Sequence, residues 1–296
     1  MKFLRKLFER KPRIEKIEIT KRFNLIGGVG QGSMSKVYKA IDTLSGRTVA
    51  LKVLDREKTL RFESRFPGLN KPSEGEIATQ LDHPNVVRTT EFGWTVNDEQ
   101  FLVMEFIEGV SLSFLIDMQN EQMRSNRLQY IIQLAEALSY FHAQNWIHRD
   151  ICPRNILVDT ENCVKLIDFG LVVPNEPVFR RPGNRTGTAS YMAPELIKRQ
   201  TTDHRIDIFS FSITVYECFC KRLPWDAAET LDAVTQHINK PPKDIRELVP
   251  GIDDELAEII MIGLKREPAD RWSSMQQVVE RLRDVQVRVG NEEVQT

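Results

Sequence analysis

The chain has 296 residues, of which 41% are hydrophobic, enough for a sizeable core, and its length allows one large domain or two of ordinary size. A net charge of −1 argues against broad electrostatic capture of nucleic acid, so we expect no nucleic-acid partner. The four cysteines show neither C-x-x-C spacing nor a neighbouring histidine cluster, which disfavours a zinc or disulfide site and favours a reduced, cytoplasmic chain.

The first residues, MKFLRKLFERKPR, differ in character from the rest of the chain. As a helix, they would place Phe3, Leu4, Leu7 and Phe8 on one face among lysines and arginines. Residues 1–13 could therefore dock weakly on a membrane surface or a partner, or they could pack on the domain or fray in solvent, which is the reading we favour. No apolar signal-peptide core is present, and the apolar stretch 206–220 is too short to span a bilayer.

Strand-like patterns come first along the chain. Strands are predicted over 36–40, 48–54 and 101–105, with a turn at 44–46 between the first two, and a helix is predicted over 71–81. The apolar spacing then becomes helical, with side chains recurring at steps of three and four residues. Helices are predicted on this basis over 128–141, 207–220, 252–264 and 274–285.

A strand-rich first third followed by helices indicates an α+β fold organised in two lobes. The joint is expected near 105–111, where the sequence EFIEGVS brings glycine and polar residues. Clefts between lobes are common ligand sites. The tail after Val289 is short and acidic, and we expect it to be loose.

The glycine cluster GVGQGSMS at 28–35 is a weak signal for phosphate binding when taken alone. Glycine lets backbone N–H groups approach phosphate oxygens without a Cβ in the way. No Walker pattern G-x-x-x-x-G-K-[ST] occurs, and a predicted strand follows the glycines where a Rossmann fingerprint would open a helix. In the pattern G-x-G-x-x-G-x-V, Val37 sets the register, so Gly30 and Gly32 take the first two glycine positions and Ser35 the third.

Three later motifs carry the strongest signal: HRDICPRN at 148–155, DFG at 168–170 and APE at 193–195. In this order and spacing they resemble the catalytic loop, the magnesium motif and the end of the activation segment of eukaryotic-like serine/threonine protein kinases, and bacterial origin is our preference. The resemblance covers roughly residues 23–285 and implies a bilobal kinase-like fold. Its N-lobe would be about 23–105 and its C-lobe about 110–286, with a basic extension at 1–22 and a tail at 287–296.

The resemblance also implies roles for individual residues. Asp150 matches the carboxylate that accepts the hydroxyl proton, while Asn155 and Asp168 match the ligands of Mg²⁺. Lys52 matches the lysine that holds the α- and β-phosphates of ATP. Its glutamate partner is best matched by Glu74, with Glu76 as the rival. The remaining positions implied for ATP are Gly30, Gly32, Ser35, Val37, Ala50, Met104, Glu105, Ile107 and Leu157, of which Glu105 and Ile107 would bond the base through their backbone.

Cys152 departs from the pattern, because it occupies the place of a lysine that touches the γ-phosphate in most serine/threonine kinases. Arg154 could supply the missing positive charge, since tyrosine kinases have an arginine at that offset. We therefore expect an active enzyme, and the alternative is a pseudokinase that serves as a nucleotide-binding regulatory scaffold. Cys152 could also be a redox-sensitive thiol, although we favour an inert small side chain.

The APE segment and Thr188 favour a protein substrate with a serine or threonine acceptor over a small molecule. Arg149, next to Asp150, suggests regulation by phosphorylation, and Thr186 is the first candidate ahead of Thr188 and Ser190. Two structural pairings are also expected. Glu195 should pair with Arg271, and Asp207 should brace the catalytic loop. The oligomeric state is not predicted.

Overall fold

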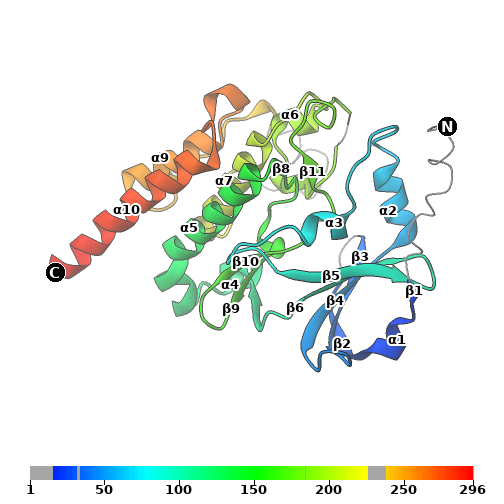
Figure 1. Cartoon of the computed structure of the whole chain (residues 1–296). Helices are drawn as coiled ribbons and strands as arrows, with labels where there is room; N and C mark the ends of the chain where they lie inside the picture. Colours follow the sequence, from blue (N-terminus) through cyan, green and yellow to red (C-terminus); the bar gives the residue numbers. More distant parts are fainter. Residues whose placement is uncertain (1–15, 32–33, 184, 226–237, 296) are drawn as a thin grey trace, which may run out of the picture. The chain divides into compact units, whose positions relative to one another are not determined.

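The computed structural model describes residues 16–31, 34–183, 185–225 and 238–295 (Figure 1). The predicted extension at residues 1–13 and Gly32 therefore lie outside the described residues. The chain divides into two compact units. Unit 1 comprises the residues up to Ser64 with 75–80 and 88–106, and unit 2 comprises 65–74, 81–87 and the residues from Ile107 onward.

Unit 1 is built on a six-stranded sheet with the strand order β1-β5-β6-β4-β3-β2. All neighbours are antiparallel except β1, which pairs in parallel with β5 at the edge of the sheet. The bounds are β1 Lys16–Ile17, β2 Phe23–Gln31, β3 Ser35–Asp42, β4 Thr48–Leu54, β5 Thr89–Thr95 and β6 Gln100–Glu105. The three predicted strands are confirmed as parts of β3, β4 and β6.

Part of the predicted glycine loop is a strand instead. Strand β2 continues to Gln31 because its backbone pairs with β3, with Gly30 opposite Val37. Two register shifts interrupt this pairing, one of them between Gly28 and Gly30. Such irregularities bend a strand and increase its twist.

The register of β3, β4 and β6 sorts their side chains onto two faces of the sheet. Lys52 lies opposite Val37 on β3 and Leu102 on β6, while Ala50 lies opposite Met104. Directly opposed residues share a face, and neighbours along a strand alternate. The other face therefore presents the buried cluster of unit 1, which consists of Phe23, Ala40, Val49, Leu51, Phe101 and Val103.

Three short helices accompany the sheet: α1 (Ile19–Arg22), α2 (Arg56–Glu63) and α3 (Glu74–Ala78). Asp55 caps α2 by accepting a hydrogen bond from the backbone N–H of Lys58. The helix predicted over 71–81 is shorter than expected, because the hydrogen bonds after Ala78 tighten to the Gln80–Ile77 spacing of a 3₁₀ turn.

Unit 2 is predominantly helical, so the α+β class with a strand-rich and a helix-rich part is confirmed. Helices α5 and α10 run side by side in unit 2, and α7 is buried along nearly its whole length (Figure 1). The helices are α4 Leu112–Met118, α5 Glu121–Ala143, α6 Pro194–Ile197, α7 Arg205–Cys220, α9 Asp254–Gly263 and α10 Met275–Gln295. Short strands complete the unit: β7 Gly109–Ser111, β8 Trp146–Ile147, β9 Ile156–Asp159, β10 Val164–Leu166 and β11 Val173–Pro174.

The four helices predicted in this part are found, with longer bounds for α5 and α10. The expectation of a loose tail after Val289 was wrong, since α10 continues to Gln295. Residues 291–295 contain no glycine or proline, the two residues that most disfavour a helix interior, so the helix can continue without a break. Among the described residues, no helix combines the length and apolar character required to cross a bilayer.

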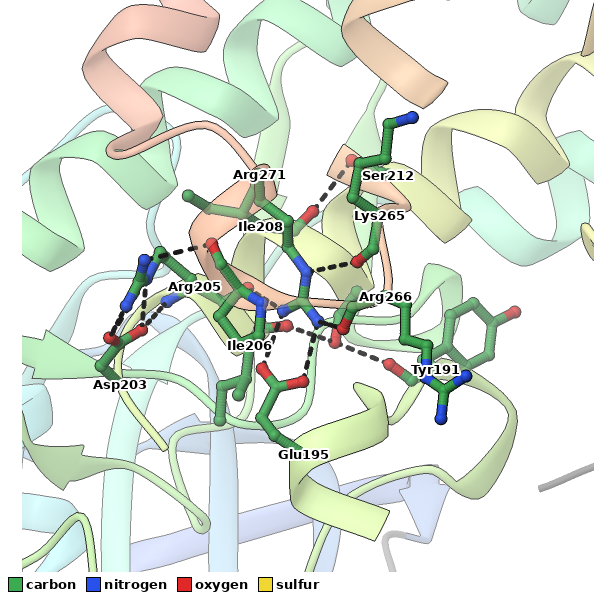
Figure 2. Close-up of polar contacts among 12 residues, drawn as sticks. Tyr191, Glu195, Asp203, Arg205, Ile206, Ile208, Ser212, Lys265, Arg266 and Arg271 are labelled. Carbon is green, nitrogen blue, oxygen red and sulfur yellow. Dashed lines mark hydrogen bonds and ion pairs between the residues drawn. The ribbon is translucent and has the colours of Figure 1, made fainter. Parts of the chain in front are cut away.

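The expected ion pair between Glu195 and Arg271 is confirmed and lies within unit 2 (Figure 2). Both guanidinium Nη atoms donate to the carboxylate, at 2.7 and 2.8 Å, and both side chains are almost fully buried. The pair joins α6 to the segment between α9 and α10, which anchors the end of the 168–195 segment to the helical core.

Candidate functional site

Asp207 of α7 holds the loop that contains the HRD motif. Its fully buried carboxylate accepts hydrogen bonds from the backbone N–H groups of His148 (2.7 Å) and Arg149 (2.8 Å), as expected. His142 Nε2 lies 3.0 Å from the same carboxylate. Arg149 has a φ of 71°, a left-handed conformation that is uncommon outside glycine and strained. Asp207 therefore stabilises the backbone turn that delivers Asp150.

Asp150 is fixed from two sides. Asn155 Nδ2 donates to the carbonyl oxygen of Asp150 (2.9 Å) and to its Oδ2 (3.0 Å). Thr188 donates to Oδ1 through its backbone N–H (2.7 Å) and its hydroxyl (2.8 Å). Because a carbonyl oxygen only accepts, the NH₂ group of Asn155 must face Asp150, and the amide oxygen of Asn155 is left out of this contact.

Gly187 permits this approach of the 168–195 segment to the HRD loop. Its φ is 119°, and a Cβ at this position would lie 2.6 Å from the carbonyl oxygen of Arg149. Any other residue would be strained and would clash with the backbone. The glycine before Thr188 is therefore required for the contact between Thr188 and Asp150.

The DFG motif lies beside Asn155, because the N–H of Ile167 donates to the Asn155 carbonyl oxygen (2.9 Å). Asp168 has a φ of 69°, again a left-handed conformation. The next side chain, Phe169, is buried and its ring contacts those of Phe141 and His148, with centroids 5.8 and 6.0 Å apart. These ring contacts hold the motif in place against α5 and the HRD loop.

The carboxylates of Asp150, Asp168 and Asp207 all act on the buried imidazole of His148. Burial nevertheless dominates and lowers the pKa of His148, so the ring stays neutral at neutral pH. The two carboxylates expected to act in chemistry are thus gathered around one side chain of unit 2.

Glu74 also reaches the DFG motif. Its Oε1 accepts a hydrogen bond from the N–H of Phe169 (3.3 Å), and the side chain is buried. A Cβ on Gly170 would lie 3.3 Å from Glu74 Oε2 and 3.4 Å from Asp168 Oδ1, so this glycine leaves room for two carboxylates to converge. Glu76, the rival match, is exposed.

Cys152 is buried, and its Sγ lies 3.7 Å from the Thr188 hydroxyl. Burial, assisted by the charge of Asp150, raises the pKa of this thiol, so it is protonated at neutral pH. Arg154 is exposed, and its charge acts on Tyr191 and Glu217, which hydrogen-bond each other. Among the described residues, the Arg154 side chain forms no ion pair within 4.0 Å.

Four residues of unit 1 that the kinase resemblance assigns to ATP binding share one face of its sheet. Val37, Ala50, Lys52 and Met104 lie on that face by register, and Lys52 is buried. Ser35 is buried at the start of β3. The backbone N–H of Glu105 donates to the Arg88 carbonyl oxygen (2.9 Å), so the bond expected from Glu105 to a base would have to use its carbonyl oxygen. Ile107 and Leu157 are half-buried in unit 2.

Comparison with known proteins decides the family, because the sequence model of the protein kinase domain matches residues 23–282. The chain belongs to the protein kinase family. A probable serine/threonine-protein kinase of Clostridium acetobutylicum is 30% identical over 277 residues, which cover 93% of this chain and 41% of that relative. Serine/threonine-protein kinase PknD of Mycobacterium tuberculosis is 30% identical, with 85% and 38% covered. PrkC of Bacillus subtilis is 27% identical, with 86% and 39% covered.

The motif-based recognition of a eukaryotic-like serine/threonine kinase family is thus confirmed. The chain spans about two fifths of the length of these curated relatives. Sequence reasoning missed His142 and the contact between Tyr191 and Glu217. His142 and Asp207 are 65 positions apart, and no spacing rule links residues that distant.

The donor set of this kinase domain fits a magnesium ion. Asn155 and Asp168 offer hard oxygen atoms, and Gly170 leaves the space in which the carboxylates of Asp168 and Glu74 converge. Within the part of the chain that the structure describes, no three His, Cys, Asp or Glu side chains form a metal-binding group. Mg²⁺ does not require one, because proteins usually bind it through one or two carboxylates with water and phosphate oxygens.

Thr186 of the kinase domain is buried, and its hydroxyl has no hydrogen-bond partner among the described residues. Arg149, next to Asp150 in the HRD motif, is also buried, and the positive charge of Arg65 repels its guanidinium. Burial lowers the pKa of Arg149 to about 10, so the guanidinium remains charged at neutral pH. Two cations of unit 2 are therefore close enough to repel each other.

Proposed function

We propose that this kinase domain transfers the γ-phosphate of ATP to serine or threonine hydroxyls of proteins. The observation that carries the proposal is the placement of Asp150, whose two oxygens are held by Asn155 and Thr188. Phosphoryl transfer needs alignment and charge compensation more than covalent chemistry, so a fixed carboxylate is the main requirement on the protein. Asp150 orients the attacking hydroxyl and accepts its proton.

The other roles follow from residue chemistry. The amide oxygen of Asn155 and the carboxylate of Asp168 would hold Mg²⁺, which when bound neutralises charge on the phosphates. Lys52 would hold the α- and β-phosphates with Glu74 as its partner. The proposed ATP contacts in addition to these are Gly30, Gly32, Ser35, Val37, Ala50, Met104, Glu105, Ile107 and Leu157.

Arg154 is proposed to supply the positive charge that Cys152 lacks. A neutral, buried thiol cannot stabilise a phosphoryl group, whereas the exposed guanidinium of Arg154 has no ion pair within 4.0 Å among the described residues. Removing an electrostatic clamp of this kind costs about 3–4 kcal/mol of transition-state stabilisation, or a factor of about 10²–10³ in rate.

Regulation is proposed to act through autophosphorylation of the segment before APE. A phosphate on Thr186 could bond the cations Arg149 and Arg65, whose mutual repulsion an anion would relieve. Because Thr186 is buried here, the segment must open before it can be modified. Mass spectrometry of the 168–195 peptide after incubation with ATP tests this, and an unmodified peptide from active enzyme would contradict it.

The proposed extent of the catalytic domain is 23–286, preceded by the basic extension and followed by residues 287–296. Docking of residues 1–13 on a membrane or partner remains a proposal from sequence. The four cysteines carry free thiols, which is in keeping with the proposed cytoplasmic location.

One experiment separates the enzyme from a pseudokinase. The purified full chain is incubated with labelled ATP, Mg²⁺ and a generic protein substrate, beside Asp150→Ala and the control Asp254→Ala. Asp254 has a side chain 95% exposed on α9. We expect labelling by the wild type and the control and a loss of at least about 100-fold for Asp150→Ala.

Equal labelling by all three proteins would reveal a contaminating kinase. No labelling by any of them, with ATP binding intact, would establish the pseudokinase alternative. For Arg154→Ala, paired with Arg124→Ala on the exposed face of α5, transfer should fall far more than ATP binding. Near-normal turnover of Arg154→Ala would refute its substitute role.

A further inference from the structure

Unit 1 has a cavity of about 550 Å³ on one side of its sheet. Its size falls within the range of ligand pockets. Its lining combines apolar side chains with charged ones around them. Its lining includes Ile19, Leu25, Lys36, Tyr38, Val53 and Glu99.

The strand residues Lys36, Tyr38 and Val53 of this cavity lie on the opposite face of the sheet from Val37, Ala50, Lys52 and Met104. Ser35, another proposed nucleotide contact, also lines the cavity at the start of β3. Tyr38 is directly opposite Leu51, which belongs to the buried cluster of unit 1, and Val53 is two positions further along the same strand. Ile19 and Val53 pack on that cluster while remaining partly exposed, and Leu25 is 43% exposed. The cavity is therefore an opening onto the core face of the sheet.

An apolar sheet face needs a covering layer, and this chain begins to supply one. Strand β1 adds to the edge of the sheet, and α1 places Ile19 on the buried cluster. Lys16 forms an ion pair with Asp98, and the carbonyl oxygen of Ile17 accepts from the N–H of Val96. Asn97 and Glu99 of this same turn line the cavity, so the chain preceding Lys16 joins unit 1 at the rim.

Charge around the cavity also favours that preceding chain. Arg56 and Lys58 of the lining have acidic partners, Asp98 and Asp55. Glu57 and Glu99 have no ion pair within the described part of the chain, and neither does Lys36. Residues 1–15 contain six lysines and arginines against two glutamates, together with six large apolar side chains, among them Phe3, Leu4, Leu7 and Phe8. They offer apolar side chains to the apolar part of the lining and positive charge to Glu57 and Glu99.

We propose that residues 1–15 of this chain bind in the cavity, with Phe3, Leu4, Leu7 and Phe8 against its apolar lining. The eight residue steps from Phe8 to Lys16 span up to about 26 Å when the chain is extended, which is enough to reach a cavity beside the point of attachment. Attachment also gives the segment an effective concentration on the order of millimolar. The proposed occupant of the cavity is therefore residues 1–15 of the same chain, and not a second copy of the protein; these residues would not be bound to a membrane instead.

Disulfide trapping in the full chain tests this binding. Leu7→Cys is combined with Lys36→Cys, an exposed position of the cavity lining, or with Leu44→Cys as the control. Leu44 is 76% exposed in the turn between β3 and β4, at the end of that hairpin remote from Lys36. Under oxidised glutathione, the cavity pair should form its intramolecular disulfide at least about tenfold faster than the control pair.

A second variant links the trapping to apolar contact. Adding Phe3→Ser, Leu4→Ser and Phe8→Ser to the cavity pair should lower its rate to that of the control. Equal rates for the two pairs, or no effect of the three serines, would overturn the proposal. Disulfides formed only between chains would assign the cavity to a second copy and overturn it as well.

A vesicle arm distinguishes the membrane reading of the same segment. Vesicles containing phosphatidylserine should leave the trapping rate of the cavity pair unchanged. A fall to the control rate would show that the segment prefers the membrane, and would overturn the proposal. The readout is a disulfide and not activity, so it stands apart from the proposed phosphoryl transfer.

Discussion

The buried pair of Glu195 and Arg271 should be among the most costly interactions to break in unit 2. All five N–H donors of Arg271 are used (Figure 2). Two go to the Glu195 carboxylate, and the others go to the carbonyl oxygens of Lys265, Arg205 and Arg266 at 2.8, 3.1 and 3.0 Å. The guanidinium also lies 4.7 Å from the ring centroid of Phe209.

Arg271→Ala leaves a carboxylate buried without its partner and removes the donor from three carbonyl oxygens. Breaking a buried pair in this way costs about 3–5 kcal/mol in the free energy of unfolding. For a chain of this size, 1 kcal/mol corresponds to about 2–4 °C in Tm, so we expect a fall of about 10 °C. Arg271→Lys should be intermediate, because an ammonium has three donors where the guanidinium has five.

Differential scanning calorimetry and urea unfolding measure this effect. The matched control is Arg266→Ala, because the Arg266 side chain is 54% exposed and its ion pair in the described part of the chain is with exposed Glu267. Its removal should change stability by less than about 1 kcal/mol. The double variant Glu195→Leu/Arg271→Met should be more stable than Arg271→Ala, because it leaves no unpaired charge. A loss below about 1 kcal/mol for Arg271→Ala would refute the reasoning.

Three further predictions concern packing, pH and thiol chemistry. Gly263→Ala would place a Cβ 1.9 Å from the hydroxyl oxygen of Ser212 and 2.9 Å from its Cβ. This clash should lower the free energy of unfolding, measured in urea, by about 1–3 kcal/mol. Adding Ser212→Gly should relieve the clash, and a further loss of stability in the double variant would contradict the prediction. The pKa of His148 is lower in the folded chain than in the unfolded chain, because the side chain is buried. The unfolded chain therefore binds the proton first, and the free energy of unfolding should fall as the pH drops below about 6.5. An equally steep fall in His148→Phe would count against this cause. Iodoacetamide should alkylate half-buried Cys163 before the buried thiols of Cys152 and Cys218 in the folded chain. Peptide mass spectrometry measures this order. Rapid labelling of Cys152 would contradict its burial and its raised pKa.

Local chemistry made much of the site predictable. The strand over Thr48–Leu54 and the spacing from Asp150 to Asn155 and Asp168 are properties of short segments, because strand alternation and loop motifs depend on neighbours in sequence. Counting along the sequence favours Glu74 over Glu76 as the partner of Lys52, which stays a prediction; Glu74 is buried and Glu76 is exposed.

Other features depended on contacts between distant residues. The tail after Val289 reads as loose, yet the structure continues α10 through it. Strand β1 forms by pairing with the edge strand β5, and His142 is positioned by its contact with Asp207. The sequence by itself determined the kinase motifs, since the chemistry of each resides in a few adjacent residues. Tertiary structure alone decided which side chains share a buried carboxylate and which face of a sheet remains open, because burial and pairing are set by packing between segments far apart in the chain.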